Sequence, residues 1–274
     1  GDHNRANGVA ALLAARSGAR YITMEHLQEA MMKVIAGPEK KSRVIPQHER
    51  ELTAYHEAGH AVVMHALPDQ DPVTQITIVP RGQAGGMTIS LPEEDRSYLS
   101  RRYMEDQITA LLGGRVAEKL CLGDISTGAS SDIQKASQTA RAMVTKYGMT
   151  ERLGAVKLGS DSDEPFLGMQ AGMGSGHRDY SDAIAAAIDE EVANQINTAH
   201  QEAFDCLVTN REVLDELVRQ AMVEAAGAQQ SHLPAHGKVS RISTATGLSR
   251  REVARLLESA TQPCTPPRWL AGPR

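Results

Sequence analysis

Two histidines and a glutamate near residue 60 have the spacing of a metal-dependent hydrolase. His56, Glu57 and His60 form the pattern H-E-x-x-H within the apolar run 52–67. On a helix, residues four apart lie on one face, so both imidazoles can bind the same Zn²⁺ ion. Glu57 then lies beside the metal, where it can take a proton from water. The pattern therefore predicts a zinc peptidase-type centre, on a helix that we expect to begin near Thr53.

A catalytic zinc site needs a third protein ligand, and the sequence offers two carboxylates for it. The longer pattern H-E-x-x-H-x-x-G-x-x-H fails, because Val63 and Ala66 stand where glycine and histidine are required. Glu118 lies in the helical segment GGRVAEKL, and a glutamate from a downstream helix can complete such a site. Asp132 follows the glycine-containing turn TGASS at the start of another helix. Spacing alone leaves both candidates open.

The composition is that of an ordinary soluble globular protein of 274 residues, 41% hydrophobic and 23% charged. Aromatic residues make up only 3%, so we expect a core of aliphatic side chains and methionine, which suits helices. The scattered cysteines Cys121, Cys206 and Cys264 predict a reducing compartment and no disulfide framework. No apolar stretch reaches the roughly 18 residues that can span a bilayer. We therefore expect a cytoplasmic protein.

Hydrophobic periodicity predicts a mainly α fold with a small β-sheet beside the H-E-x-x-H helix. Apart from that helix, helical patterns occupy 8–16, 24–35, 98–120, 132–147, 182–208 and 212–226. Alternating patterns predict strands at 75–79 and 87–91. Thr23 is the expected N-cap of the second helix, and Gly37-Pro38 its expected end.

A series of motifs in one order resembles the peptidase domain of the FtsH-type ATP-dependent zinc proteases, from Ile35 to about Gln220. The residues that carry the resemblance are IAGPEKKSRVI, LTAYHEAGHAVV, ITIVPRG, SLPEEDR, LLGGRVAEKL, ISTGASSDIQKA and MVTKYGM, followed by FLG, RDYSD and IDEEV. The resemblance implies Zn²⁺ as cofactor, with His56, His60 and Asp132 as its ligands and Glu57 as the catalytic base. It makes Glu118 a supporting residue near the site.

The implied substrates are unfolded or ATPase-delivered proteins. An extended substrate could pair with 76–79 or with 85–88 by β-augmentation, which suits weak sequence preference. The expected substrate-binding residues are Ile78, Gly86, Met87 and Thr88.

The resemblance also divides the chain into three parts. Residues 1–45 are similar to the last helices of the AAA lid subdomain and a linker, 46–228 to the zinc peptidase domain, and 229–274 form a basic tail. The sequence contains no G-x-x-x-x-G-K-[ST] loop, so we expect a chain without its own ATPase or membrane anchor. The family assembles as a hexamer, and a separate AAA ATPase is an expected partner. A catalytically idle ring or adaptor subunit is the alternative.

The tail differs in charge and pattern from the rest of the chain. From residue 231 onward seven basic residues face two acidic ones, whereas the preceding residues carry a net charge of −10. Residues 238–258 predict a helix-turn-helix unit and resemble a small bacterial family of uncharacterised regulators. Arg250, Arg251 and Arg255 could contact DNA, in which case the chain would be a peptidase fused to a DNA-binding regulator. The alternative is a helical hairpin whose arginines are exposed to solvent. The proline-rich end 263–274 is expected to be disordered.

Overall fold

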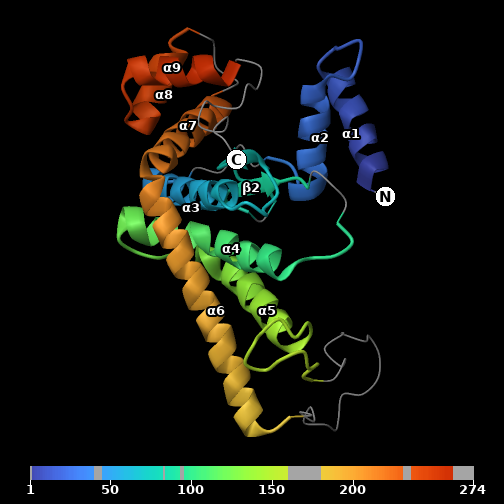
Figure 1. Ribbon diagram of the computed structural model, residues 1–274. Helices are drawn as coiled ribbons and strands as arrows, with labels where there is room; N and C mark the ends of the chain where they lie inside the picture. Colours follow the sequence, from blue (N-terminus) through green and yellow to red (C-terminus); the bar gives the residue numbers. More distant parts are fainter. Residues whose placement is uncertain are drawn as a thin grey trace, which may run out of the picture. The chain divides into compact units, whose positions relative to one another are not determined.

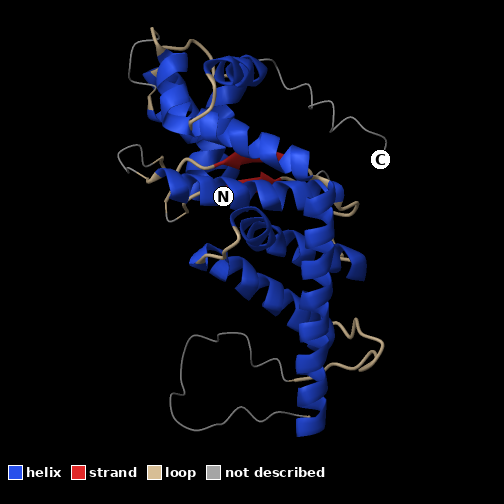
Figure 2. Cartoon of the chain, turned by 90° about the vertical axis from the view of Figure 1, so that its left-hand side faces the viewer, coloured by secondary structure: helices blue, strands red, loops and turns tan. Residues whose placement is uncertain are grey.

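The computed structural model describes residues 2–39, 45–82, 84–92, 96–159, 180–230 and 236–261 (Figure 1). Its helices are α1 (Asp2–Arg16), α2 (Met24–Ala36), α3 (Gln47–Ala66), α4 (Arg101–Leu122), α5 (Ser130–Thr145), α6 (Asp182–Thr209), α7 (Arg211–Gln229), α8 (Lys238–Thr246) and α9 (Arg250–Thr261), with a short 3₁₀ helix η1 (Thr127–Ala129). Strands β1 (Val73–Thr77) and β2 (Met87–Ser90) form a two-stranded sheet, shown in red in Figure 2.

This architecture confirms the predicted mainly α fold with a small sheet. No helix in the described part of the chain is long and apolar enough to cross a membrane. The FLG motif and the proline-rich end 263–274 lie outside the described residues.

The expected start of the H-E-x-x-H helix was wrong. Helix α3 begins at Gln47, directly after Pro46, whose carbonyl accepts a hydrogen bond from the Arg50 amide at 3.1 Å. Thr53 lies inside the helix, where its hydroxyl donates to the Glu49 carbonyl at 2.8 Å. Proline fits a helix start because it has no amide hydrogen to leave unsatisfied. The expected cap of α2 is confirmed, since the Thr23 side chain accepts from the His26 amide.

The chain divides into two compact units. Unit 1 comprises Gly1–Glu57, Gln75–Thr88 and Glu216–Arg274, and unit 2 comprises Ala58–Thr74 and Ile89–Asp215. Residues 47–57 of helix α3 belong to unit 1 and residues 58–66 to unit 2.

Unit 2 is built on helix α4, which packs against both α5 and α6. Its core consists of buried apolar side chains from these three helices. The alanine residues of α5 are small and allow the helices to pack closely. The buried members are Met104, Ile108, Leu112, Ala136, Ala140, Met143 and Ala199. This core therefore consists of methionine, leucine, isoleucine and alanine, as expected for a chain with few aromatic residues.

The second half of α3 and the middle of α4 approach each other through two glycines in unit 2. A Cβ atom on Gly59 would lie 2.6 Å from the carbonyl oxygen of Gly113, and one on Gly113 would lie 2.8 Å from the carbonyl oxygen of Gly59. Side chains essentially never come this close to a backbone oxygen, so both positions require glycine for this packing.

In unit 1, the loop after β1 is joined to the N-terminal helices by a buried arginine. The side chain of Arg81 donates to Glu29 of α2 at 2.8 Å and to Glu39 at 2.6 Å. Arg81 is only 5% exposed, so its charge requires these two carboxylates. Helices α1 and α2 pack against each other as a hairpin.

Replacing Gly113 with alanine tests the close approach of α3 and α4. Despite the better helix propensity of alanine, we expect Gly113→Ala to lower the free energy of unfolding by about 1–3 kcal/mol, because the backbones must separate. Gly8→Ala is the matched control: Gly8 lies inside α1 with nothing within 4 Å of an added Cβ, so up to about 1 kcal/mol of stabilisation is expected. Urea denaturation followed by circular dichroism measures both; equal stability of the two variants would contradict the packing argument.

Candidate metal centre

The residues of the H-E-x-x-H pattern lie in the middle of α3 and are largely shielded from solvent. His56 is 9% exposed and Glu57 is 8% exposed. Their neighbours along the helix are small or branched apolar residues, among them Ala54, Ala58 and Val62, which are also buried. A carboxylate and an imidazole at this depth require polar partners, because an unpaired buried charge is costly.

His60 is held by a carbonyl oxygen of helix α4. Its Nδ1 lies 2.8 Å from the carbonyl oxygen of Ala110. Because a carbonyl oxygen only accepts, Nδ1 must carry the hydrogen and donate it. The neutral ring then presents the lone pair of Nε2 on its other side, which is the atom that can bind a metal. The contact depends on the close approach of α3 and α4 at Gly59 and Gly113.

Glu57 is positioned by strand β2, within unit 1. The Thr88 hydroxyl lies 2.8 Å from Glu57 Oε2 and 2.9 Å from the Glu57 carbonyl oxygen, and can donate to either. A Cβ atom on Gly86 would lie 2.8 Å from Cγ and 2.9 Å from Oε1 of Glu57. Glycine at position 86 therefore leaves room for the carboxylate, and Thr88 fixes its orientation.

Asp132 lies in the first turn of α5, behind a turn that helix α4 holds in place. The buried Glu118 carboxylate of α4, which is 0% exposed, accepts from the Ser126 amide at 2.7 Å and from the Ser126 hydroxyl at 3.1 Å. The same hydroxyl oxygen accepts from the Gly128 amide at 3.1 Å, which caps η1. Glu118 thus anchors the turn that leads into Asp132.

His56, His60 and Asp132 come together as one group of potential metal ligands. One ligand atom from each lies within 4.8 Å of the others, and His60 Nε2 is 3.6 Å from Asp132 Oδ2. Two imidazole nitrogens and one carboxylate oxygen form a donor set that Zn²⁺ accepts. Ligands about 2.0–2.1 Å from a tetrahedral zinc ion lie roughly 3.3–3.4 Å apart, so the 3.6 Å separation fits such an ion.

The other residues predicted from the sequence lie in different surroundings. Ile78 is 3% exposed, so its side chain is buried and not accessible to a substrate in this structure. Thr88 and Gly86 contact Glu57, and Met87 begins β2. Three contacts were not predicted from the sequence. They are the hydrogen bonds from Thr88 to Glu57, from His60 to the Ala110 carbonyl, and from Ser126 to Glu118. No residue type marks a carbonyl contact, whereas a serine before T-G-A is a recognisable cap signal.

Removing one acceptor from Glu118 tests the anchoring of the turn. In Glu118→Gln the side-chain amide group replaces a carboxylate oxygen that accepts from Ser126, so one partly buried donor loses its partner. We expect the free energy of unfolding to fall by about 1–3 kcal/mol. Glu105→Gln on the same helix is the control, because among the described residues the Glu105 side chain forms a surface pair with Arg101 alone, worth at most about 0.5 kcal/mol. Urea titration of both variants measures the free energy of unfolding. An unchanged value in Glu118→Gln would show that Glu118 does not anchor the turn.

The chain is similar to a group of curated zinc metalloproteases. It is 55% identical over 211 residues to the ATP-dependent zinc metalloprotease FtsH of Cutibacterium acnes (strain SK137), covering 77% of this chain and 29% of the relative. It is 52% identical over 215 residues to ATP-dependent zinc metalloprotease FtsH 1 of Thermoanaerobacter sp. (strain X514), covering 78% of this chain and 34% of the relative.

The third relative is the ATP-dependent zinc metalloprotease FtsH of Rubrobacter xylanophilus, 47% identical over 224 residues, which are 82% of this chain and 34% of the relative. The chain spans about a third of the length of these curated relatives. The family model for peptidase family M41 matches residues 43–232. This match covers the H-E-x-x-H pattern and Asp132, which lies close to both histidines. The chain therefore belongs to peptidase family M41.

Proposed function

We propose that this chain is a zinc-dependent endopeptidase that hydrolyses unfolded or ATPase-delivered proteins. The observation that carries the proposal is the group formed by His56, His60 and Asp132, with the buried Glu57 next to His56 in the same helix. Membership of family M41 and the names of the relatives, all zinc metalloproteases, support the same chemistry.

In this proposal His56, His60 and Asp132 would hold Zn²⁺. When bound, the ion polarises a water molecule and the scissile carbonyl and stabilises the negative charge that develops on the carbonyl oxygen. Glu57 accepts the proton of the attacking water and later delivers it to the leaving amine. Thr88 keeps the Glu57 carboxylate in one orientation, and the Ala110 carbonyl keeps the His60 ring in the tautomer that can act as a ligand.

The proposed substrate contact is backbone pairing with the β1–β2 sheet. A two-stranded sheet leaves an edge on each strand that no other described strand occupies. An extended peptide can add to such an edge with main-chain hydrogen bonds, which require no particular side chain. Thr88 of β2 contacts Glu57, so a peptide paired along β2 would run close to the catalytic base. Gly86 and Met87 belong to the same segment.

The proposed partners are five further copies of the chain in a ring and a separate AAA ATPase. The relatives are named ATP-dependent, and the matched region covers about a third of their length. We propose the arrangement of a lid remnant and linker at 1–45, a peptidase domain at 46–228 and a basic tail at 229–274. The idle-subunit alternative receives no support from the site, since each residue of the expected catalytic set is present.

Replacing Glu57 with glutamine should abolish hydrolysis of casein while the protein retains zinc. The side-chain amide of a glutamine cannot accept the proton of the attacking water, and losing a general base typically costs about 10²–10⁴-fold in rate. Glu51→Gln, an exposed position on the same helix, is the control and should keep wild-type activity. Release of casein fragments and bound zinc are measured for all three proteins. Equal activity of Glu57→Gln and wild type would overturn the proposed mechanism.

The identity of the third ligand is tested by zinc affinity. Asp132→Ala should weaken zinc binding by more than the roughly 10–100-fold expected for loss of a residue that only supports a ligand. Glu118→Gln should stay within that smaller range, and Asp124→Ala, an exposed aspartate before η1, should have no effect. Competition with a chromophoric chelator measures the three affinities. A greater loss in Glu118→Gln than in Asp132→Ala would reverse the assignment.

A further inference from the structure

The last two helices and the end of α7 form a small three-helix unit with its own apolar core. Residues from all three helices are buried in it, namely Val223, Ala226, Ile242, Val253 and Leu256. Helices α8 and α9 lie beside the end of α7 (Figure 1). The match to family M41 ends at residue 232, so α8 and α9 lie beyond the matched region.

The connection between α8 and α9 is the tight turn of a helix-turn-helix unit. Three residues separate the helices, and the first, Gly247, has φ +76°, which suits glycine. The Ser243 hydroxyl donates to the Leu248 carbonyl at 2.7 Å. The Ser249 hydroxyl accepts from the Glu252 amide at 3.2 Å and caps α9. These bonds fix the angle at which α9 leaves the turn.

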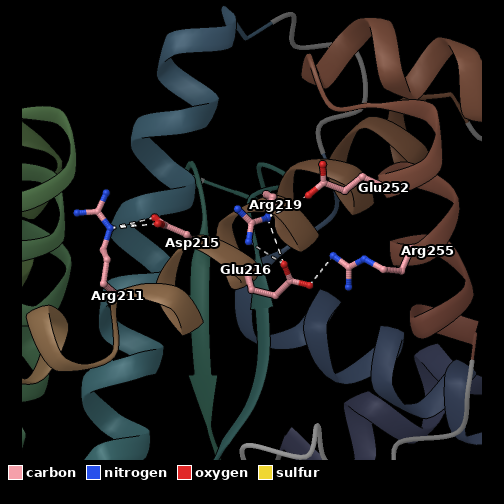
Figure 3. Close-up of polar contacts among 6 residues, drawn as sticks. All are labelled: Arg211, Asp215, Glu216, Arg219, Glu252 and Arg255. Atoms are coloured by element: carbon pink, nitrogen blue, oxygen red, sulfur yellow. Dashed lines mark hydrogen bonds and ion pairs between the residues drawn. The ribbon is translucent and has the colours of Figure 1, made fainter.

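Ion pairs between α7 and α9 determine which charges of α9 remain available (Figure 3). Glu216 of α7 accepts from Arg255 at 2.7 Å, and Arg219 pairs with Glu252 at 3.3 Å. Burial raises the pKa of Glu216, but the hydrogen bonds from Arg255 and Arg219 outweigh burial and lower it. The acidic Glu252 and the basic Arg255 are thus both engaged with α7.

Arg250 and Arg251, the first two residues of α9, are exposed and have no ion-pair partner among the described residues. Residues 236–261 contain five basic and two acidic side chains, a net charge of +3 in a chain whose total is −5. The second acidic residue, Glu258, lies two turns beyond Arg251 along the helix. Positive charge is therefore concentrated at the start of α9, next to the turn.

We propose that this three-helix unit binds duplex DNA, with the first turn of α9 in the major groove. In helix-turn-helix proteins the start of the second helix meets the base edges, and the groove is wide enough for one helix. Arg250 and Arg251 contact phosphates or guanine, for which the guanidinium group is suited. Arg255 instead holds α9 on α7. The inference is independent of the peptidase activity.

Other partners fit this surface less well. Residues 236–261 contain no phenylalanine, tyrosine or tryptophan, whereas binding of single-stranded nucleic acid relies on aromatic stacking. Insertion into a membrane requires an exposed apolar face, but Val253 and Leu256 of α9 are buried in the core of the unit. Duplex DNA needs only the exposed positive charge and the helix geometry that this unit presents.

The experiment measures fluorescence anisotropy of a labelled random-sequence duplex of about 25 base pairs with the full chain, at about 50–200 mM salt. The test variant replaces Arg250 and Arg251 with alanine. The matched control replaces Arg101 and Arg102, the first two residues of α4, which are exposed but pair with Glu105 and Asp69. Both double variants remove the same charge from the same position in a helix. Circular dichroism establishes that both are folded.

We expect R250A/R251A to weaken duplex binding by at least about tenfold and to reduce the salt slope by about two, with little change in the control. Absence of binding by the wild type at the lowest salt would overturn the proposal. An equal loss in both double variants would also overturn it, because binding would then depend on general positive charge and not on the start of α9. Tighter binding of a single strand than of the duplex would also exclude the groove geometry.

Discussion

The site depends on the close approach of two helix backbones at Gly59 and Gly113. Without side chains at these positions, α3 and α4 come near enough for the Ala110 carbonyl to accept from His60 Nδ1. That single hydrogen bond determines both the tautomer and the direction in which Nε2 points. A larger residue at either glycine would move the imidazole, and His60 Nε2 would no longer lie 3.6 Å from Asp132 Oδ2.

Helix α4 serves the site from two places along its length. Ala110 orients His60 through its carbonyl, and two turns later Glu118 anchors Ser126 before the helix that carries Asp132. Because α4 also packs against α5 and α6, its position is determined by the core of unit 2. Bulky packing side chains and the supporting polar groups thus share one rigid element, which reduces the freedom of the His60 and Asp132 side chains.

Much of this arrangement could be predicted from the sequence because it depends on local spacing. The i, i+4 histidines, the alternating strands and the Thr23 cap are all short-range signals. The choice between Glu118 and Asp132 could not be made from spacing, since both carboxylates belong to elements whose packing the sequence does not specify. The start of α3 was misplaced because Thr53 resembles a cap, while the helix begins after Pro46. Thr88 was expected to contact the substrate, and nothing in the sequence indicated its contact with Glu57.

The C-terminal helices show the same division between local and long-range information. Gly247 and Ser249 predict the turn and the cap. The sequence alone does not show which of the three arginines, Arg250, Arg251 and Arg255, is available to a ligand. They differ only because Glu216, more than thirty residues earlier, faces Arg255 and not the other two. An arginine already paired with a carboxylate must give up that pair before it can bind a phosphate, and the exchange of one anion for another gains little. The surface available to a polyanion is therefore set by α7, a helix of the peptidase family fold, and not by α9 alone.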